Sequence, residues 1–353
     1  PYAKIPPGYP LFVAGVFALF GRSLLAVRAA QVVLGMAVVW LVYLAGKHAF
    51  SWRVGLLAAL IAALYPPFVV FVAPYWTETL YTGLVLIFIL YFVRLLRDST
   101  IGDVSLAGVG FGLSMLVKES LIAFPLALPV SFWWARFERR QALRYLVVFA
   151  AAALLVLSPW LARNYLAFDH IFYTSRTSYI RYELTGTGYL SPRFEDEVVE
   201  RESPSAPSDK LYDYYQRYGR TSDLWNPRLL LREPATYLRY IVNRLIEFWL
   251  HPNGLESLPG HVALRAAYMT AHLGMLGIAL WQMLLCLRRR DAATGGLALI
   301  MLYMTGVGVF LRRPNPRYNL PFVPIVLIFA ARGILDLAGR LYGYDRLSKR
   351  ETG

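Results

Sequence analysis

Apolar runs long enough to cross a lipid bilayer recur along almost the whole chain, and they constrain its fold more than any other feature. A crossing of the roughly 30 Å hydrocarbon core takes about 20 apolar residues, and backbone groups in lipid must pair within the protein. Charged residues make up only 16% of the sequence, against about 25% in soluble domains. The runs therefore predict an all-α polytopic membrane protein.

We predict nine crossings, each with ends placed to within several residues. They cover residues 27–47, 54–73, 77–96, 102–117, 120–135, 143–161, 264–286, 295–311 and 321–340. The connections after the odd-numbered crossings carry clustered arginines and lysines, which the positive-inside rule places in the cytoplasm. We therefore expect a multi-pass protein of the inner (plasma) membrane, with a cytoplasmic C-terminus and its unusual polar residues on the external or periplasmic face.

The pattern divides the chain into three parts. Residues 1–161 hold a helix at the outer interface, from Pro6 to Phe20, followed by six spans. Residues 162–262 form an external, α-rich loop domain, whose end from Tyr237 to Leu250 is amphipathic and is expected to lie along the outer membrane surface. Residues 263–353 add three spans and a cytoplasmic tail. The chain begins with proline and no first membrane anchor precedes this part, which indicates an N-terminally truncated protein.

The charge and cysteine content exclude several classes of function. The formal charge is +14, but most arginines sit at the ends of apolar runs, where they orient the protein and do not indicate nucleic-acid binding. The single cysteine, Cys286, excludes an intrachain disulfide and a thiolate metal cluster. No phosphate-binding loop and no histidine or cysteine ligand motif appears, so no metal site is assigned, although Glu78 or Glu119 could help to hold a divalent cation.

Two charged groups interrupt the apolar pattern on the predicted external side. Glu78 begins a crossing, where a carboxylate can stabilise the helix N-terminus or can face an outer cavity as a supporting catalytic group. Lys118 and Glu119 meet between two short crossings. They either neutralise each other or act on a substrate, with Lys118 binding an anionic head group and Glu119 positioning it.

Two further groups belong to the same side. Arg163 and Asn164 follow Pro159, a residue that can mark a helix end, and they place a phosphate-binding fork beside a hydroxyl-binding amide. Arg317 and Tyr318 lie in the last external connection, which holds three arginines against the positive-inside bias. General contact with phospholipid head groups is the alternative explanation for those arginines. Together these groups predict an external site for a phosphate-bearing lipid.

At these residues the chain resembles bacterial GT-C glycosyltransferases, the group of protein O-mannosyltransferases and lipid A aminoarabinose transferases (family 39 type). The matching residues occur in order over nearly the whole chain: Lys4 to Pro10 with Phe20, Gly21 and Arg28; Tyr65 to Pro67 with Thr77 and Glu78; Leu116 to Glu119; Pro159 and Trp160 with Arg163 and Asn164; and Arg317 to Pro321 with Gly333. Residues 170–260 match least.

The resemblance implies a GT-C bundle of about nine helices that passes a sugar from a polyprenyl-phosphate donor to a glycan, lipid or protein acceptor outside the membrane. It places Lys4, Arg317 and Tyr318 near the donor phosphate, where the residues themselves also predict Lys118 and Arg163, with Glu119 and Asn164 positioning the substrate. The family's catalytic acid lies upstream of the Pro-Pro-Gly-Tyr stretch and is expected before residue 1, so Glu78 is only a supporting group. A single displacement would invert the anomeric centre.

Two other functions fit parts of the pattern. An O-antigen ligase or polymerase also combines a large external loop with arginines, but it consumes diphosphate-linked glycans. A lipid or sugar transporter would favour inverted repeats and broken helices at the midplane, and neither is found in the sequence.

Overall fold

The computed structural model describes residues 5–169, 171, 173–174, 231, 234–250, 262–311 and 316–341. Every regular element within those residues is a helix. The α-helices are α1 (Gly8–Phe20), α2 (Leu24–Ala49), α3 (Trp52–Leu64), α4 (Pro66–Val70), α5 (Glu78–Asp98), α6 (Ile101–Met115), α7 (Leu128–Trp134), α8 (Arg139–Phe168), α13 (Pro234–Leu250), α14 (Val262–Arg289), α15 (Ala292–Gly306) and α16 (Val323–Leu341). The all-α class predicted from the sequence is confirmed.

Six of the described helices are long and apolar enough to cross a membrane. They lie within residues 24–49, 78–98, 139–168, 265–289, 292–309 and 320–341, and each coincides with a predicted crossing. The protein is therefore a multi-pass membrane protein. The total of nine crossings stays a prediction, because the other three correspond to shorter apolar helices.

Prolines explain why two of those three segments are broken. The predicted crossing 54–73 divides into α3 and α4, with Pro66 starting the second helix. The predicted crossing 120–135 consists of 3₁₀ turns at Glu119–Leu121 and Phe124–Ala127 followed by the seven-residue α7. Proline has no backbone N–H and clashes with the preceding turn, so an α-helix does not continue regularly through Pro125 and Pro129.

Helix α8, in contrast, continues through a proline. The sequence suggested a helix end near Pro159, but α8 runs for 30 residues to Phe168 with that proline inside it. Proline cannot donate to the carbonyl of Leu155, four residues earlier, and the Ser158 hydroxyl donates to that oxygen instead, at 2.9 Å. Because 30 residues of helix measure about 45 Å, the last turns of α8 extend beyond a roughly 30 Å hydrocarbon core.

Local side-chain hydrogen bonds define where several helices begin. Ser23, Ser51, Thr100 and Asp291 each precede a helix and accept a hydrogen bond from the backbone N–H three residues later. Such caps satisfy donors that the first helical turn leaves unpaired. These residues fix the starts of α2, α3, α6 and α15.

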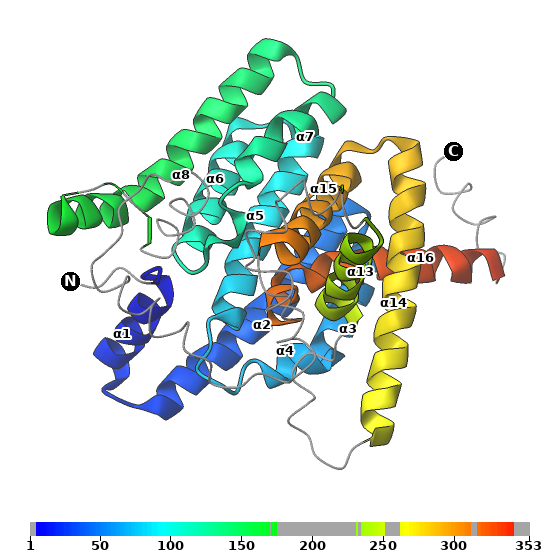
Figure 1. Ribbon diagram of the computed structural model, residues 1–353, viewed down its shortest axis with the longest axis horizontal. Coiled ribbons are helices and arrows are strands. Elements are labelled where there is room, and N and C mark those ends of the chain that lie inside the picture. The colour runs from blue at the N-terminus through cyan, green and yellow to red at the C-terminus, as the bar shows by residue number, and fades with distance from the viewer. Residues whose placement is uncertain are drawn as a thin grey trace.

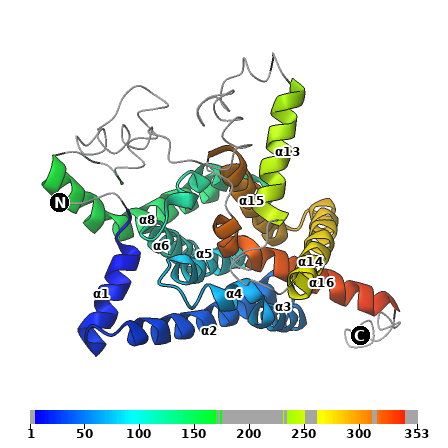
Figure 2. The ribbon, with the colours of Figure 1, turned by 60° about the horizontal axis from the view of Figure 1, so that its bottom comes forward.

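The helices form a bundle around α5, which contacts α2, α6 and α15 (Figure 1). The faces of α5 and α16 are largely buried, whereas α2 and α8 leave many apolar side chains exposed, as suits helices that face lipid. Helix α13 projects from the bundle, as Figure 2 shows. Its C-terminal turn is buried through Phe248 and Trp249, so at least this end packs into the protein.

Candidate functional site

A fully buried carboxylate lies at the first turn of α5. Glu78 is 0% exposed, and the turn before it contains no side chain that caps the helix. Among the described residues, its Oε2 accepts a single long hydrogen bond, from Thr77 Oγ1 at 3.4 Å. Burying a charged group is costly unless it is paired, so the groups around the other oxygen determine what this residue does.

Two cations from distant parts of the chain meet at Glu78 Oε1. Lys118 Nζ lies 3.0 Å from it, while Arg317 donates from Nε at 3.0 Å and from a terminal nitrogen at 2.7 Å. Lys118 follows the end of α6, and Arg317 lies in the 3₁₀ turn Pro316–Tyr318 before α16. Three residues that the sequence analysis had selected separately are thus brought into one cluster.

Aromatic rings surround both cations. The Arg317 guanidinium lies 4.0 Å from the ring centre of Trp76, and Lys118 Nζ lies 5.6 Å and 5.7 Å from those of Tyr318 and Tyr81. Such cation–π contacts hold a charged group in place while leaving its positive charge intact. The Lys118 side chain is 15% exposed and that of Arg317 is 38% exposed, so the cations reach an accessible surface although the carboxylate does not.

Backbone contacts hold the two cation-bearing turns. Gly8 donates its N–H to the Leu116 carbonyl at 2.6 Å, and a Cβ at that position would lie 2.6 Å from the same oxygen. Only glycine therefore permits α1 to press against the turn that leads to Lys118. On the other side, the fully buried Asn319 donates its side-chain N–H to the carbonyl of Phe248 in α13, which fixes the turn carrying Arg317.

Tyr9 and Gln31 complete the surroundings of Glu78, and neither was assigned a role from the sequence. Gln31 is fully buried in α2 and donates to the Trp76 carbonyl at 3.1 Å and to the Tyr9 hydroxyl at 3.5 Å. Burial, followed by the charge of Glu78, raises the pKa of Tyr9. The signal available in the sequence was the amide of Gln31 within an otherwise apolar crossing, where polar residues mark functional sites.

Arg163 and Asn164 form a second cluster near the C-terminal end of α8. Arg163 donates to the Asn164 side-chain oxygen at 2.9 Å and stacks over Trp160. Asn164 is fully buried and donates to the Tyr173 carbonyl at 3.1 Å, and the Tyr173 hydroxyl donates to the carbonyl of Met115 at the end of α6. Burial, with a smaller contribution from the charge of Glu119, raises the pKa of Tyr173 well above its usual range.

Parts of the predicted site lie outside the described residues. These are Lys4, the other two arginines of the last external connection, and most of the loop domain 162–262. Within the described part of the chain, no group of three or more His, Cys, Asp or Glu side chains is arranged to hold a metal ion. A divalent cation at Glu78 or Glu119 therefore stays a prediction.

Comparison with known proteins gives one family match and several structural matches. Residues 4–162 match the model of the dolichyl-phosphate-mannose-protein mannosyltransferase family. No curated protein sequence matches the chain.

The structural matches extend over nearly the whole chain. ArnT from Cupriavidus metallidurans bound to undecaprenyl phosphate aligns with 99% of this chain and 53% of its own, at 14% identity and a TM-score of 0.57. The oligosaccharyltransferase AglB from Archaeoglobus fulgidus, in complex with an inhibitory peptide and a dolichol-phosphate, aligns with 98% of this chain and 44% of its own, at 15% identity and a TM-score of 0.56. The chain thus spans about half the length of these proteins.

The two comparisons agree with each other. The family match covers α1 to most of α8, which includes Glu78 and Lys118, and the fold match continues through α16. Residues 4–162 are thus similar to the mannosyltransferase family, and the chain as a whole has a fold similar to those of ArnT and AglB.

Proposed function

We propose that this chain forms the membrane module of a glycosyltransferase that takes a sugar from a polyprenyl-phosphate donor. The acceptor is a glycan, a lipid or a protein on the external or periplasmic face of the inner membrane. The observation that carries the proposal is the pairing of Lys118 and Arg317 around the buried Glu78. Cations held in fixed positions at one predicted membrane face suit a lipid-linked phosphate.

The charge balance of the cluster supports this ligand. Two positive side chains and one carboxylate leave one positive charge among these three groups. A phosphate that links a sugar to a polyprenol carries one negative charge, so its arrival brings the sum to zero. Arginine and lysine also attract phosphate more strongly in a partly buried site than in water.

Each charged residue then has a distinct role. Arg317 and Lys118 hold the phosphate, with Tyr318 beside them, and Glu78 is a positioning residue because its Oε1 orients both cations. Lys4 contributes a further cation to the phosphate. Arg163 binds the donor from the outer turns of α8, while Asn164 and Glu119 position the substrate.

The reaction is a single displacement at the anomeric carbon. An acceptor oxygen forms the new bond to that carbon as the bond to the phosphate oxygen breaks, and the electron pair of the broken bond stays on the polyprenyl phosphate. The acceptor proton passes to a base that we do not assign to a residue of this chain. Lys118 and Arg317 stabilise the additional charge on the departing phosphate, and the product has inverted configuration.

Ligand binding tests the site directly. Undecaprenyl phosphate is titrated into the purified chain in nanodiscs, with Lys118→Gln and Arg317→Gln as variants. Loss of a charge-assisted hydrogen bond should weaken binding by about ten-fold or more in each variant. Lys47→Gln and Arg53→Gln, at exposed positions in the last turn of α2 and the first turn of α3 on the predicted cytoplasmic side, are matched controls that should leave binding unchanged.

Two outcomes contradict the proposal. Equal affinity in wild type, site variants and controls would remove the phosphate site from this cluster. Failure of the longer protein that contains this chain to transfer labelled sugar from any polyprenyl-phosphate donor would remove the activity, even if binding were retained.

A further inference from the structure

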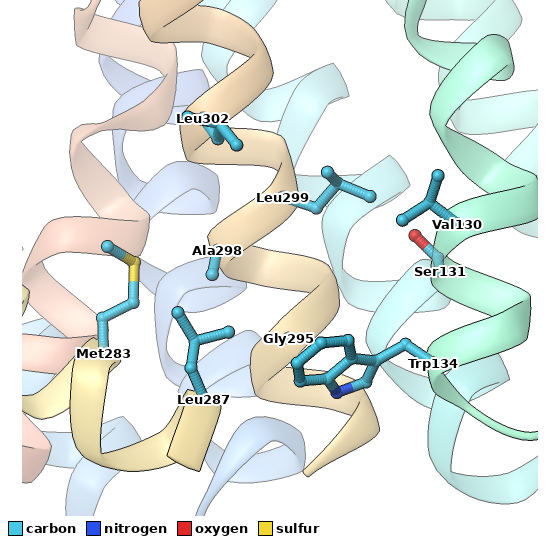
Figure 3. Close-up of a pocket in the computed structure, with 9 residues that line it drawn as sticks. All are labelled: Val130, Ser131, Trp134, Met283, Leu287, Gly295, Ala298, Leu299 and Leu302. Atoms are coloured by element: carbon cyan, nitrogen blue, oxygen red, sulfur yellow. The ribbon is translucent and has the colours of Figure 1, made fainter. Parts of the chain in front are cut away.

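A cavity of about 250 Å³ lies beside the start of α15, which packs against the C-terminal end of α5, away from Glu78 at its start. It is formed by α7, α14 and α15, and Figure 3 shows its lining residues. Apart from the Ser131 hydroxyl, which donates to a backbone carbonyl, and the indole nitrogen of Trp134, the lining side chains are apolar. Drug-sized ligands occupy about 300–1,000 Å³, so this cavity suits one segment of a hydrocarbon chain.

One end of the cavity opens beside exposed apolar side chains. Val130 and Leu302 are 50% and 69% exposed, and Leu302 lies farthest from Trp134 in Figure 3. Exposed apolar side chains on both walls allow a lipid chain to enter sideways from the membrane.

The other end lies close in the chain to four arginines. Trp134, Leu287 and Gly295 lie together there (Figure 3). Arg136 follows Trp134 by two residues, and Arg288, Arg289 and Arg290 directly follow Leu287; all four are exposed. The nearby acids in sequence are Glu138 and Asp291, and Asp291 is already paired with Arg97 at 3.6 Å.

Residue 295 determines the shape of this end. A Cβ on Gly295 would lie 2.8 Å from the indole nitrogen of Trp134, so the missing side chain lets the ring lie directly against α15. Tryptophan is favoured at membrane interfaces because its ring is amphipathic. The cavity thus runs from a mouth beside exposed apolar side chains to an end close in the chain to four arginines.

We propose that this cavity binds one acyl chain of an anionic phospholipid, with the phosphate head group at Arg136 and Arg288 to Arg290. The charge of those arginines distinguishes an anionic lipid from a zwitterionic one. Under the predicted orientation the lipid comes from the cytoplasmic leaflet. This site is independent of the proposed sugar donor, which binds at the other face.

The test measures which lipids stay bound to the full chain. The protein is purified in detergent with phosphatidylglycerol or phosphatidylcholine of identical acyl chains, and retained lipid is counted by native mass spectrometry. We expect preferential retention of phosphatidylglycerol. Arg288→Gln with Arg289→Gln should reduce that preference by about five-fold for each arginine, whereas the control pair Lys47→Gln with Arg53→Gln should not change it.

Filling the cavity tests the acyl-chain part separately. Leu299→Trp should lower retention of both lipids by about ten-fold, and Leu155→Trp on the exposed face of α8 should not. If Leu299→Trp fails to fold, Leu302→Trp closes the mouth from an exposed position. Equal retention of the two lipids, unchanged retention after filling, or displacement of the lipid by undecaprenyl phosphate would each overturn the proposal.

Discussion

Two buried carboxylates begin neighbouring helices at opposite ends of the bundle. Glu78 starts α5 and Asp103 lies in the first turn of α6, at 0% and 2% exposure. The 21 residues of α5 separate these two ends by about 31 Å. A carboxylate in the first turn of a helix is favoured by the helix dipole in both cases.

Their partners differ. Asp103 accepts a hydrogen bond from the hydroxyl of Thr100 at 2.5 Å, and its own backbone N–H donates back to that hydroxyl at 3.1 Å. Arg94, nine positions earlier in the chain, lies 2.9 Å from it. Residues close in sequence therefore account for Asp103 as the partner of the Thr100 helix cap with one ion pair.

Glu78 depends instead on partners 40 and 239 positions away. Two cations converge on one of its oxygens, and both are also held by aromatic rings. The comparison teaches that burial alone does not identify a functional carboxylate. Glu78 differs from Asp103 because two cations from distant parts of the chain meet at it, which the start of a helix does not require.

The largest expected difference between Glu78 and Asp103 is in the stability lost when each carboxylate is replaced by its amide. Glu78→Gln removes the buried negative charge that both Lys118 and Arg317 contact, so we expect a loss of about 3–5 kcal/mol in the free energy of unfolding. Asp103→Asn removes the charge beside one arginine and should cost about 1–3 kcal/mol. Denaturant unfolding in matched detergent micelles measures both. Equal losses would mean that the second cation adds nothing to the environment of Glu78.

Replacing the arginine beside each carboxylate with lysine should affect sugar transfer very differently at the two sites. Arg317→Lys loses the fork that donates twice to Glu78 and the stacking on Trp76, and we expect sugar transfer by the longer protein to fall by about 100-fold. Arg94→Lys keeps a cation beside Asp103 and should change transfer less than about two-fold. A similar fall in both variants would indicate a loss of membrane-inserted protein, which immunoblotting of washed membranes would detect.

The smallest expected difference is in the stability lost when the threonine that precedes each helix is replaced by alanine. Thr100→Ala removes the hydroxyl that bonds Asp103 and should cost about 1 kcal/mol of stability. Thr77 makes no cap bond to the α5 backbone, so Thr77→Ala should cost less than about 0.5 kcal/mol. Thermal unfolding of the two variants side by side measures the difference. A larger effect at Thr77 would show that its long contact with Glu78 Oε2 matters more than its distance indicates.

The long helices could be predicted because about 20 apolar residues have few alternatives in lipid. All six long apolar helices among the described residues coincide with predicted crossings. The broken segments were less predictable, because a proline can interrupt a helix, as near Pro66, or be tolerated inside one, as at Pro159. The difference at Pro159 rests on the Ser158 hydroxyl, whose hydrogen bond depends on a side-chain conformation.

The site could be predicted residue by residue but not as a cluster. Glu78, Lys118 and Arg317 each stood out because a charge near an apolar run needs a partner. Which charges meet depends on how α5, α6 and α16 pack, and a single sequence carries no direct record of that packing. Gln31 and Tyr9 were missed because an amide and a phenol within an apolar helix give a weaker signal than a charge.

The close approach of α1 to the turn before Lys118 has a consequence for natural variation. Gly8 has no side chain that could bind a substrate, yet even a methyl group there would collide with the Leu116 carbonyl. An alanine at this position would push apart the N-terminal segment and the lysine-bearing turn. A genetic change that looks conservative, and that alters no charge and no catalytic group, would thus behave as a loss-of-function allele.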